Sequence, residues 1–384
     1  MFLFALGSTV LFGKGQLLVL GILLTVSYGV YFLKEQPAVP LEILLFLAWL
    51  AWSLAAYWLK MSELLTEPYF ETLLRTAQVA AMAFAVTGIA VRSGSPKVAF
   101  SALALGALIL LAYSVSTGDF MLTPDRFRTT GLTNNPNYFG FIMLMAVVGL
   151  LFFFEKQGSL LRRGVIASLI VLLMFGILAS GSRKAFVGFV FLMLAWWWFC
   201  FKDEVFRRPQ YLLLLILVAG LIVFSIEYML ENTFMGRRFQ RDFVEKQEQL
   251  EEHKRIGLYE EGFELIKQNP VVGVGLGNFK YRSFYHAMSH SDYIEVAVST
   301  GLVGFVLYFS IYVLLWRRLS FLRKFTRERS VWYMAGVARA CVLLLLLLAL
   351  GRPNFYDIIA WVALGTCIGY AYAQQRRLQC ALSS

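Results

Sequence analysis

The stretch NPVVGVGLGNFKYRSFYHAMSHSDYIEV, residues 269–296, closes a long polar insertion between two hydrophobic segments of the chain. The insertion begins near residue 231, ends near residue 290, and holds all three histidines, His253, His286 and His290. Histidine and arginine side chains transfer protons or bind anions, and here they interrupt a chain that is otherwise largely apolar. We therefore expect any chemistry of this protein to lie at the insertion.

The composition predicts a membrane protein. Of 384 residues, 59% are hydrophobic and only 15% are charged, and the mean hydropathy is +0.66. Soluble domains carry about 25% charged residues, so the composition excludes an ordinary soluble protein. The net charge of +11 does not indicate nucleic-acid binding, because the lysines and arginines stand in short clusters between apolar runs.

The apolar runs predict an all-α polytopic fold with about twelve transmembrane helices, since roughly 17–25 residues cross the hydrocarbon core. The first run lacks the basic region and cleavage site of a signal peptide and is interpreted as a short span. The chain then divides into a transmembrane bundle (1–230), a large loop (231–290), and further spans with a tail (291–384). The expected spans are residues 2–12, 16–33, 39–59, 73–91, 98–115, 138–154, 164–180, 185–201, 210–230, 291–316, 331–350 and 354–373.

The distribution of basic residues predicts the orientation of these spans. With the long insertion left aside, one set of connectors holds 17 lysines and arginines, including the cluster between Arg317 and Arg329, and the short connectors of the other set hold 8. The positive-inside rule places the more basic set, and both termini, in the cytoplasm. The unusual polar motifs then share the outer face: RFRTTGLTNNPNYFG, SGSRK, the insertion, and GRPNFYD.

Two of these outer segments carry local structural signals. Pro136 forces Asn135 out of the helical region, and Asn137 is expected to cap the helix that follows. In the insertion, apolar residues recur at steps of three and four and predict an amphipathic helix pair at the membrane surface, ended by Asn269 and Pro270. The apolar residues of this pattern are Ile256, Tyr259, Phe263 and Ile266.

Two arginines of the outer face are candidate ligands for an anion. Arg183 stands in a connector of about four residues, so it is either an interfacial anchor or an anion ligand. Arg255 precedes Tyr259 by one helical turn and either shares its face in a site or is simply solvated. The sequence leaves both alternatives open.

The closing stretch of the insertion offers a base, a metal site or a turn. His286 and His290 are four residues apart and are expected on one face of a helix, which suits either zinc or general-base catalysis. The glutamate of an HExxH motif is missing, which favours the base. Gly273, Gly275 and Gly277 lack the strand context of a dinucleotide loop and predict a tight re-entry turn.

Few other residues are candidates for a functional role. Arg339 lies in the middle of a span and needs a polar partner, for which Glu295 and Asp357 are candidates. The four cysteines form no CxxC pair and are interpreted as packing residues, namely Cys200, Cys341, Cys367 and Cys380.

Taken together, these features resemble the O-antigen ligase and polymerase superfamily. The resemblance rests on many spans, the outer SR connector, the large outer loop, an arginine one turn before an aromatic residue, NPVVGVGLGNF, and HSDYIEVAVSTGLVG. It is strongest over residues 176–305 and looser over GLTNNPNYFG. In one departure, this chain has Ser291 followed by Asp292 where the family usually has an asparagine directly after the histidine.

The resemblance implies a GT-C-like, inverting glycosyltransferase of the bacterial inner membrane that uses no metal and no cofactor. Its donor would be a glycan on undecaprenyl diphosphate, and its acceptor, at the periplasmic face, a hydroxyl of the lipid A core. Arg183 and Arg255 would bind the donor diphosphate, His290 would activate the acceptor, and Tyr259 and Tyr281 would contact sugars. Secondary candidates are His286, Arg339, Asn137, Tyr259 and Asp292.

The chemistry of the residues is consistent with this activity. Cleavage of a sugar–diphosphate bond needs positive charge at the leaving group, and the chain has no DxD motif for a metal, whereas two arginines can supply the charge. The alternatives are a polysaccharide polymerase with the same donor, a lipid-linked glycan transporter, which would show half-repeats and broken helices, and a membrane scaffold. We favour the ligase on the overall pattern.

Overall fold

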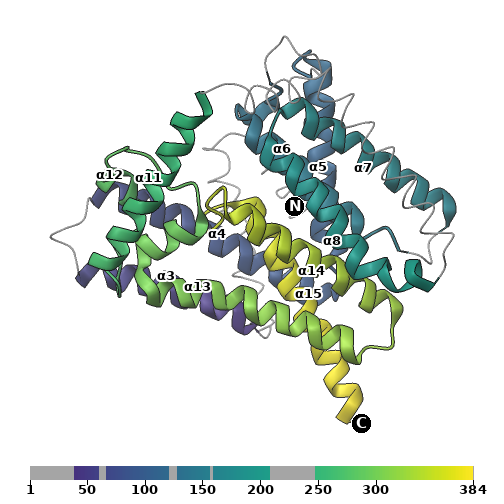
Figure 1. Cartoon of the computed structure of the whole chain (residues 1–384). Helices are drawn as coiled ribbons and strands as arrows, with labels where there is room; N and C mark the ends of the chain where they lie inside the picture. Colours follow the sequence, from purple (N-terminus) through teal and green to yellow (C-terminus); the bar gives the residue numbers. More distant parts are fainter. Residues whose placement is uncertain (1–38, 60–65, 121–127, 156–158, 208–246, 384) are drawn as a thin grey trace. The chain divides into compact units, whose positions relative to one another are not determined.

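The computed structural model describes residues 39–59, 66–120, 128–155, 159–207 and 247–383, and all regular secondary structure in these ranges is helical (Figure 1). The predicted spans 2–12, 16–33 and 210–230 lie outside the described residues. The described elements are α3 (Leu41–Leu59), α4 (Thr66–Ser93), α5 (Lys97–Ser116), η1 (Gly131–Thr133), α6 (Pro136–Leu151), α7 (Leu160–Ser180), α8 (Arg183–Arg207), α11 (Gln247–Gln268), α12 (Phe279–Arg282), α13 (Asp292–Phe325), α14 (Arg329–Ala349) and α15 (Ile358–Ser383).

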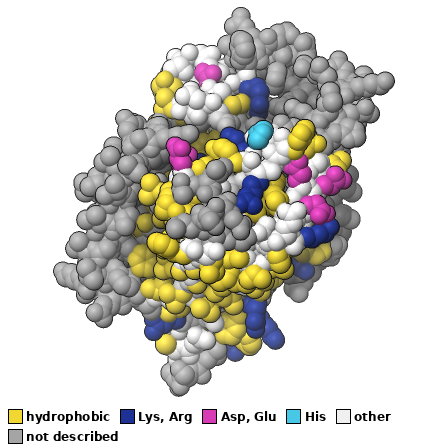
Figure 2. All heavy atoms as spheres, turned by 90° about the vertical axis from the view of Figure 1, so that its left-hand side faces the viewer, with side chains coloured by type: hydrophobic (Ala, Val, Ile, Leu, Met, Phe, Trp, Pro, Cys, Tyr) yellow, Lys and Arg dark blue, Asp and Glu magenta, His cyan; other side chains and the backbone are white. Residues whose placement is uncertain are grey.

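The helices support the predicted class of polytopic membrane protein. Within the described ranges, seven helices are long and apolar enough to cross a bilayer, namely α3, α4, α5, α7, α8, α13 and α14, and α6 is a shorter apolar helix. On the face drawn in Figure 2, hydrophobic side chains form a broad band with charged side chains at its two ends. The predicted number of twelve spans stays a prediction.

The chain forms two compact units, which we describe separately. Among the described residues, the first comprises residues 100–120, 128–155, 159–207, Gln247 and Arg327–Leu344. Its centre is α6, in which every side chain from Phe139 to Leu151 is buried, as expected for a helix that is apolar all round. The hydroxyl of Tyr333, in α14, donates to the Leu151 carbonyl at 2.9 Å and accepts from Trp196 Nε1 at 3.0 Å.

Among the described residues, the second unit comprises residues 39–59, 66–99, 248–326 and 345–383. Helices α4 and α15 pack together, and α13 packs on α3 and α15. Buried aromatic rings fill the centre: Phe46 stacks on Trp361 at 3.7 Å between centroids, and Trp49 lies 5.4 Å from Tyr308. Helix α4 begins at Thr66, seven residues before the predicted span, and contains Arg75.

Helix α13 is broken in its first third. Gly301 has φ 67° and ψ −175°, which separates a short half-helix, beginning at Asp292, from the long remainder of α13. A Cβ at this position would lie 2.2 Å from the Val271 carbonyl oxygen, so only glycine fits. The break had no counterpart in the predicted span 291–316, because hydropathy does not report backbone direction.

The glycine turn of the insertion satisfies the backbone groups that the break exposes. The Val298 and Ser299 carbonyls accept from the N–H groups of Val274 at 2.8 Å and Gly275 at 2.9 Å. In exchange, the Leu302 N–H donates to the Pro270 carbonyl at 2.8 Å. Gly273, Gly275 and Gly277 all have positive φ, so the predicted re-entry turn is confirmed, and its task is to fix the broken helix.

Candidate active site

The three residues that carry the predicted chemistry fall in different units. Arg183 belongs to the first unit, whereas Arg255 and His290 belong to the second. We therefore describe the candidate residues of each unit separately.

In the first unit, a two-residue connector joins α7 to α8. Gly181 ends α7 in the left-handed conformation, with φ 58°, and donates to the Leu178 carbonyl at 2.9 Å. The Ser182 carbonyl accepts from the Phe186 N–H at 3.0 Å as α8 begins. The connector is shorter than the four residues expected, because Arg183 is already the first helical residue. Its half-buried guanidinium thus starts at the positive end of the α8 dipole.

Arg128 holds the segment between residue 128 and α6 against this connector. Its Nε donates to the Ser180 carbonyl at 2.9 Å, and its Nη2 donates to the Gly181 carbonyl at 3.3 Å and to Asn137 Oδ1 at 2.7 Å. The Thr129 N–H also donates to the Ala179 carbonyl, at 3.0 Å. Sequence reasoning gave Arg128 no role, since nothing local signals a contact made 52 residues away.

The expectation that Asn137 caps α6 is wrong. The cap is Asn135, whose side-chain oxygen accepts from the N–H groups of Asn137 at 3.0 Å and Tyr138 at 3.2 Å. Asn135 has φ −144° and ψ 108°, so the predicted effect of Pro136 is confirmed. The proline itself is the first helical residue, which moves the cap two positions upstream and leaves Asn137 Oδ1 to Arg128.

In the second unit, His290 lies in the turn that opens the first half of α13. The expectation that His286 and His290 share a helix face is wrong, because both have positive φ, 46° and 56°, in the non-helical segment between α12 and α13. Both imidazoles are exposed. The zinc alternative relied on that shared face, and within the described ranges no group of three or more metal-binding side chains is found.

The turn around His290 is fixed by a buried carboxylate. Glu295 Oε2 accepts from the Ser289 N–H at 3.1 Å and from the Ser289 hydroxyl at 2.8 Å. The same hydroxyl lies 3.0 Å from the Ser291 carbonyl, and its oxygen accepts from the Ser291 N–H at 3.2 Å. Both neighbours of His290 are thereby held while the imidazole itself stays exposed.

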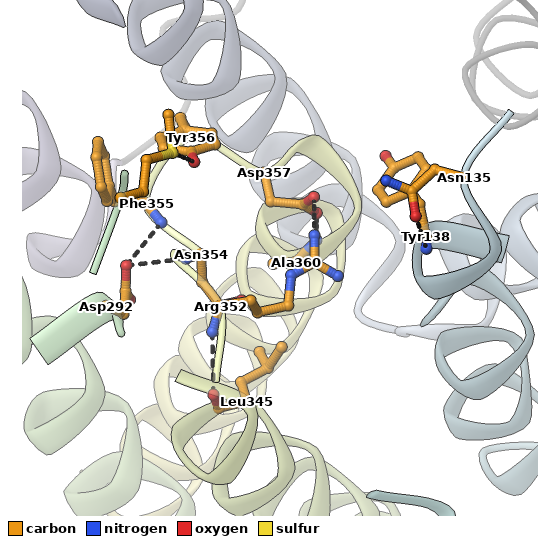
Figure 3. A network of polar contacts seen from close by, with 11 residues as sticks. Asn135, Tyr138, Asp292, Leu345, Arg352, Asn354, Phe355, Tyr356, Asp357 and Ala360 are labelled. Carbon is orange, nitrogen blue, oxygen red and sulfur yellow. Dashed lines mark hydrogen bonds and ion pairs between the residues drawn. The ribbon is translucent and has the colours of Figure 1, made fainter. Parts of the chain in front are cut away.

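Asp292 ties this turn to the connector between α14 and α15. Its Oδ1 accepts from the N–H groups of Asn354 at 2.8 Å and Phe355 at 3.2 Å (Figure 3). Its Oδ2 accepts from the Tyr308 hydroxyl at 2.9 Å. Asp292 is fully buried, so these bonds replace its lost hydration. Its role is therefore to position the turn and the GRPNFYD segment against each other.

Arg255 and Tyr259 lie near the same segment. The Tyr259 hydroxyl donates to the Leu350 carbonyl at 3.3 Å, and Arg255, one turn earlier on α11, is exposed. Leu258 forms the buried side of α11, whereas Ile256 and Phe263 remain 48% and 57% exposed. The single described helix ends at Gln268, as Asn269 and Pro270 predicted. The rest of the predicted helix pair lies outside the described residues.

The remaining candidates have local partners. Arg339 lies over the Phe199 ring, 5.7 Å from its centroid. The two carboxylates suggested as its partners bond elsewhere: Glu295 with Ser289, and Asp357 with Arg352 at 2.5 Å. Tyr281 is exposed, with Lys280 over its ring at 5.7 Å.

Comparison with known families decides the identity of this region. Residues 167–309 match the family model Wzy_C, described as O-antigen ligase. The resemblance to the O-antigen ligase superfamily is confirmed. The matched segment of this O-antigen ligase family domain includes Arg183, Arg255 and His290, and excludes Arg75, Arg128 and the GRPNFYD segment.

The family match supports a coarse function. Wzy_C proteins are glycosyltransferase-like enzymes of O-antigen processing, with lipid-linked glycan substrates in a membrane. With the apolar helices, the match indicates a multi-pass protein of the inner membrane. Comparison with curated proteins finds no match to this chain.

Proposed function

We propose that the protein is an O-antigen ligase, which transfers a glycan from undecaprenyl diphosphate to a hydroxyl of the lipid A core at the periplasmic face. The observation that carries this proposal is the state of His290. It lies inside the matched segment, is exposed, and is held on both sides by contacts of the buried carboxylates Glu295 and Asp292. An imidazole that is accessible yet fixed in position suits a general base.

The donor leaves as a diphosphate, whose developing negative charge requires fixed cations. We assign this task to Arg183 and Arg255, because a guanidinium keeps its charge and can donate two parallel hydrogen bonds to phosphate oxygens. Arg183 also stands at the beginning of α8, where the backbone N–H groups and the helix dipole favour an anion. The reaction then needs no metal ion.

The acceptor hydroxyl is the nucleophile. His290 takes its proton as the oxygen attacks the anomeric carbon, and the bond from that carbon to the diphosphate breaks on the opposite side. One displacement of this kind inverts the anomeric configuration. A positioned general base contributes about 10²- to 10⁴-fold to such a step.

Transporters also contain broken helices such as α13, but here the carbonyl groups at the break already accept hydrogen bonds from the protein. In transporters, freed carbonyls at such breaks coordinate ions. In this chain the Val298 and Ser299 carbonyls accept from the glycine turn, and the Thr300 carbonyl accepts from Trp52 Nε1 at 2.9 Å. The break therefore serves to position the His290 turn, which favours the enzyme.

A transfer assay tests the proposal. The purified protein is incubated with undecaprenyl diphosphate glycan and lipid A core in EDTA, and the lipids are separated on a gel. We expect a glycan–core conjugate. A lengthened donor glycan would instead identify a polymerase, and the absence of both products would contradict glycosyl transfer.

The periplasmic orientation has its own test, with a native cysteine as control. Cys380 is exposed in the tail that we assign to the cytoplasm, whereas the other three cysteines are buried. The side chain of Glu264, on α11, is 61% exposed. A membrane-impermeant maleimide should label Glu264→Cys in cells whose inner membrane is intact, and label Cys380 only after that membrane is opened. The reverse order would contradict the orientation.

A further inference from the structure

A cation outside the matched family segment lies close to the His290 turn. Arg75, an exposed residue of α4, stands over the ring of Tyr356, 4.6 Å from its centroid. The Tyr356 hydroxyl in turn reaches Met288 Sδ at 3.3 Å, two residues before His290. We infer that Arg75 and Tyr356 form an additional subsite that binds a phosphate group of a lipid-linked substrate beside His290. This inference rests on the proposed function.

The charges around Tyr356 leave Arg75 as the cation available for a ligand. Arg352 also acts electrostatically on Tyr356, but it is paired with Asp357. Within the described part of the chain, Arg75 has no ion-pair partner and rests only on the aromatic ring. A guanidinium held over a ring still has N–H groups that the ring does not use, and these can form a forked pair of hydrogen bonds with phosphate.

Tyr356 adds a donor that is poorly used in the absence of a ligand. Its hydroxyl contacts a thioether sulfur, which is a weak acceptor, so a phosphate oxygen can replace this contact at little cost. Burial raises the pKa of the Tyr356 hydroxyl, which therefore remains protonated and able to donate at neutral pH. One tyrosine and one arginine thus offer donors to the same anion.

The position of this subsite relative to His290 is fixed within the second unit. Asp292 accepts from Asn354 and Phe355, the two residues that precede Tyr356. Glu295 holds Ser289 on the other side of Met288. A substrate phosphate bound by Arg75 would therefore lie at a defined place next to the proposed base.

The phosphate has two possible sources, the donor diphosphate and phosphates on the acceptor glycolipid. The test measures binding of each to the full chain in phosphatidylcholine nanodiscs, with undecaprenyl diphosphate glycan and phosphorylated lipid A core as separate probes. We expect Arg75→Ala to weaken binding of one probe about tenfold or more, as for loss of a charge-assisted contact. The probe affected identifies the source.

Further variants separate this role from a surface anchor. Arg75→Lys should restore part of the affinity, and Tyr356→Phe, which keeps the ring, should weaken the same probe about threefold. The matched control is Lys280→Ala, which removes a cation from over Tyr281 at 5.7 Å in the same unit. It should bind both probes as the wild type does.

The two proposals fail in different ways. Unchanged affinity of Arg75→Ala for both probes, or binding of neither probe by the wild type, would overturn the subsite. Wild-type protein that binds a phosphorylated lipid through Arg75 but yields no conjugate would overturn the ligase and leave the subsite standing.

Discussion

The Arg183 connector of the first unit and the His290 turn of the second unit are held by different physical means. In the first unit, a two-residue connector places Arg183 through local backbone structure, with Gly181 ending one helix and Ser182 beginning the next. In the second, the His290 turn depends on buried carboxylates and on a connector more than sixty residues away. A local cap makes an independent and modest contribution, whereas a buried carboxylate with three donors leaves several groups unsatisfied when it is removed. We therefore expect substitutions at the His290 turn to destabilise the protein more than substitutions at the Arg183 connector.

The largest effect should distinguish the two exposed histidines of the second unit. His290→Ala should lower the transfer rate about 100-fold or more while donor affinity is retained, because it removes the base but no phosphate contact. His286→Ala, at a similarly exposed left-handed position outside the turn that Glu295 and Asp292 hold, should change the rate less than about threefold. Single-turnover rates and donor binding report the two quantities. Equal losses would contradict the assignment of His290.

The next largest effect is expected for the candidate arginines of the two units. Arg183→Lys and Arg255→Lys should each lower transfer about tenfold or more, because an ammonium cannot reproduce a bidentate phosphate contact. Arg282→Lys, at an exposed position of α12, is the matched control. Near-normal turnover of Arg255→Lys would remove that residue from the diphosphate site.

Substitutions of Asp292 test the contribution of the buried carboxylate to stability. Asp292→Ala should destabilise the fold by about 1–3 kcal/mol or more, since three donors lose their acceptor in a buried site. Asp292→Asn keeps an acceptor for the Asn354 and Phe355 N–H groups and should lie between the alanine variant and the wild type. Thermal unfolding in detergent measures the order. An alanine variant as stable as the wild type would show that the network does not hold the turn.

The smallest effect is expected at the Arg183 connector of the first unit. Ser182→Ala removes a side-chain acceptor for the Ala185 N–H at 3.4 Å and should cost about 0.5–1 kcal/mol. Its melting temperature should therefore fall less than that of Asp292→Ala. A larger fall in melting temperature for Ser182→Ala would contradict the proposed greater sensitivity of the His290 turn.

Local features were predictable from sequence. The extended Asn135 before Pro136, the positive φ values of the glycine turn and the end of α11 at Asn269–Pro270 all follow from the steric properties of proline and glycine. The membrane class followed from composition, since apolar helices of span length have few alternatives. The choice of Arg183, Arg255 and His290 came from family resemblance rather than from physics.

The remaining features depend on contacts between distant segments. The break at Gly301 and the Asp292 network join residues that the sequence separates widely, and no periodicity encodes such pairs. The prediction of a helix containing His286 and His290 was wrong for a related reason. Their spacing of four fits a helix, but the segment is drawn into a turn by the bonds of Ser289 to Glu295.

The central claim is that His290 activates an acceptor hydroxyl for a single direct displacement of the lipid diphosphate. The most direct test is the anomeric configuration of the new glycosidic bond, read by NMR of the purified conjugate and compared with that of the donor. We expect the opposite configuration. Retention would indicate two successive displacements and would contradict the assigned role of His290.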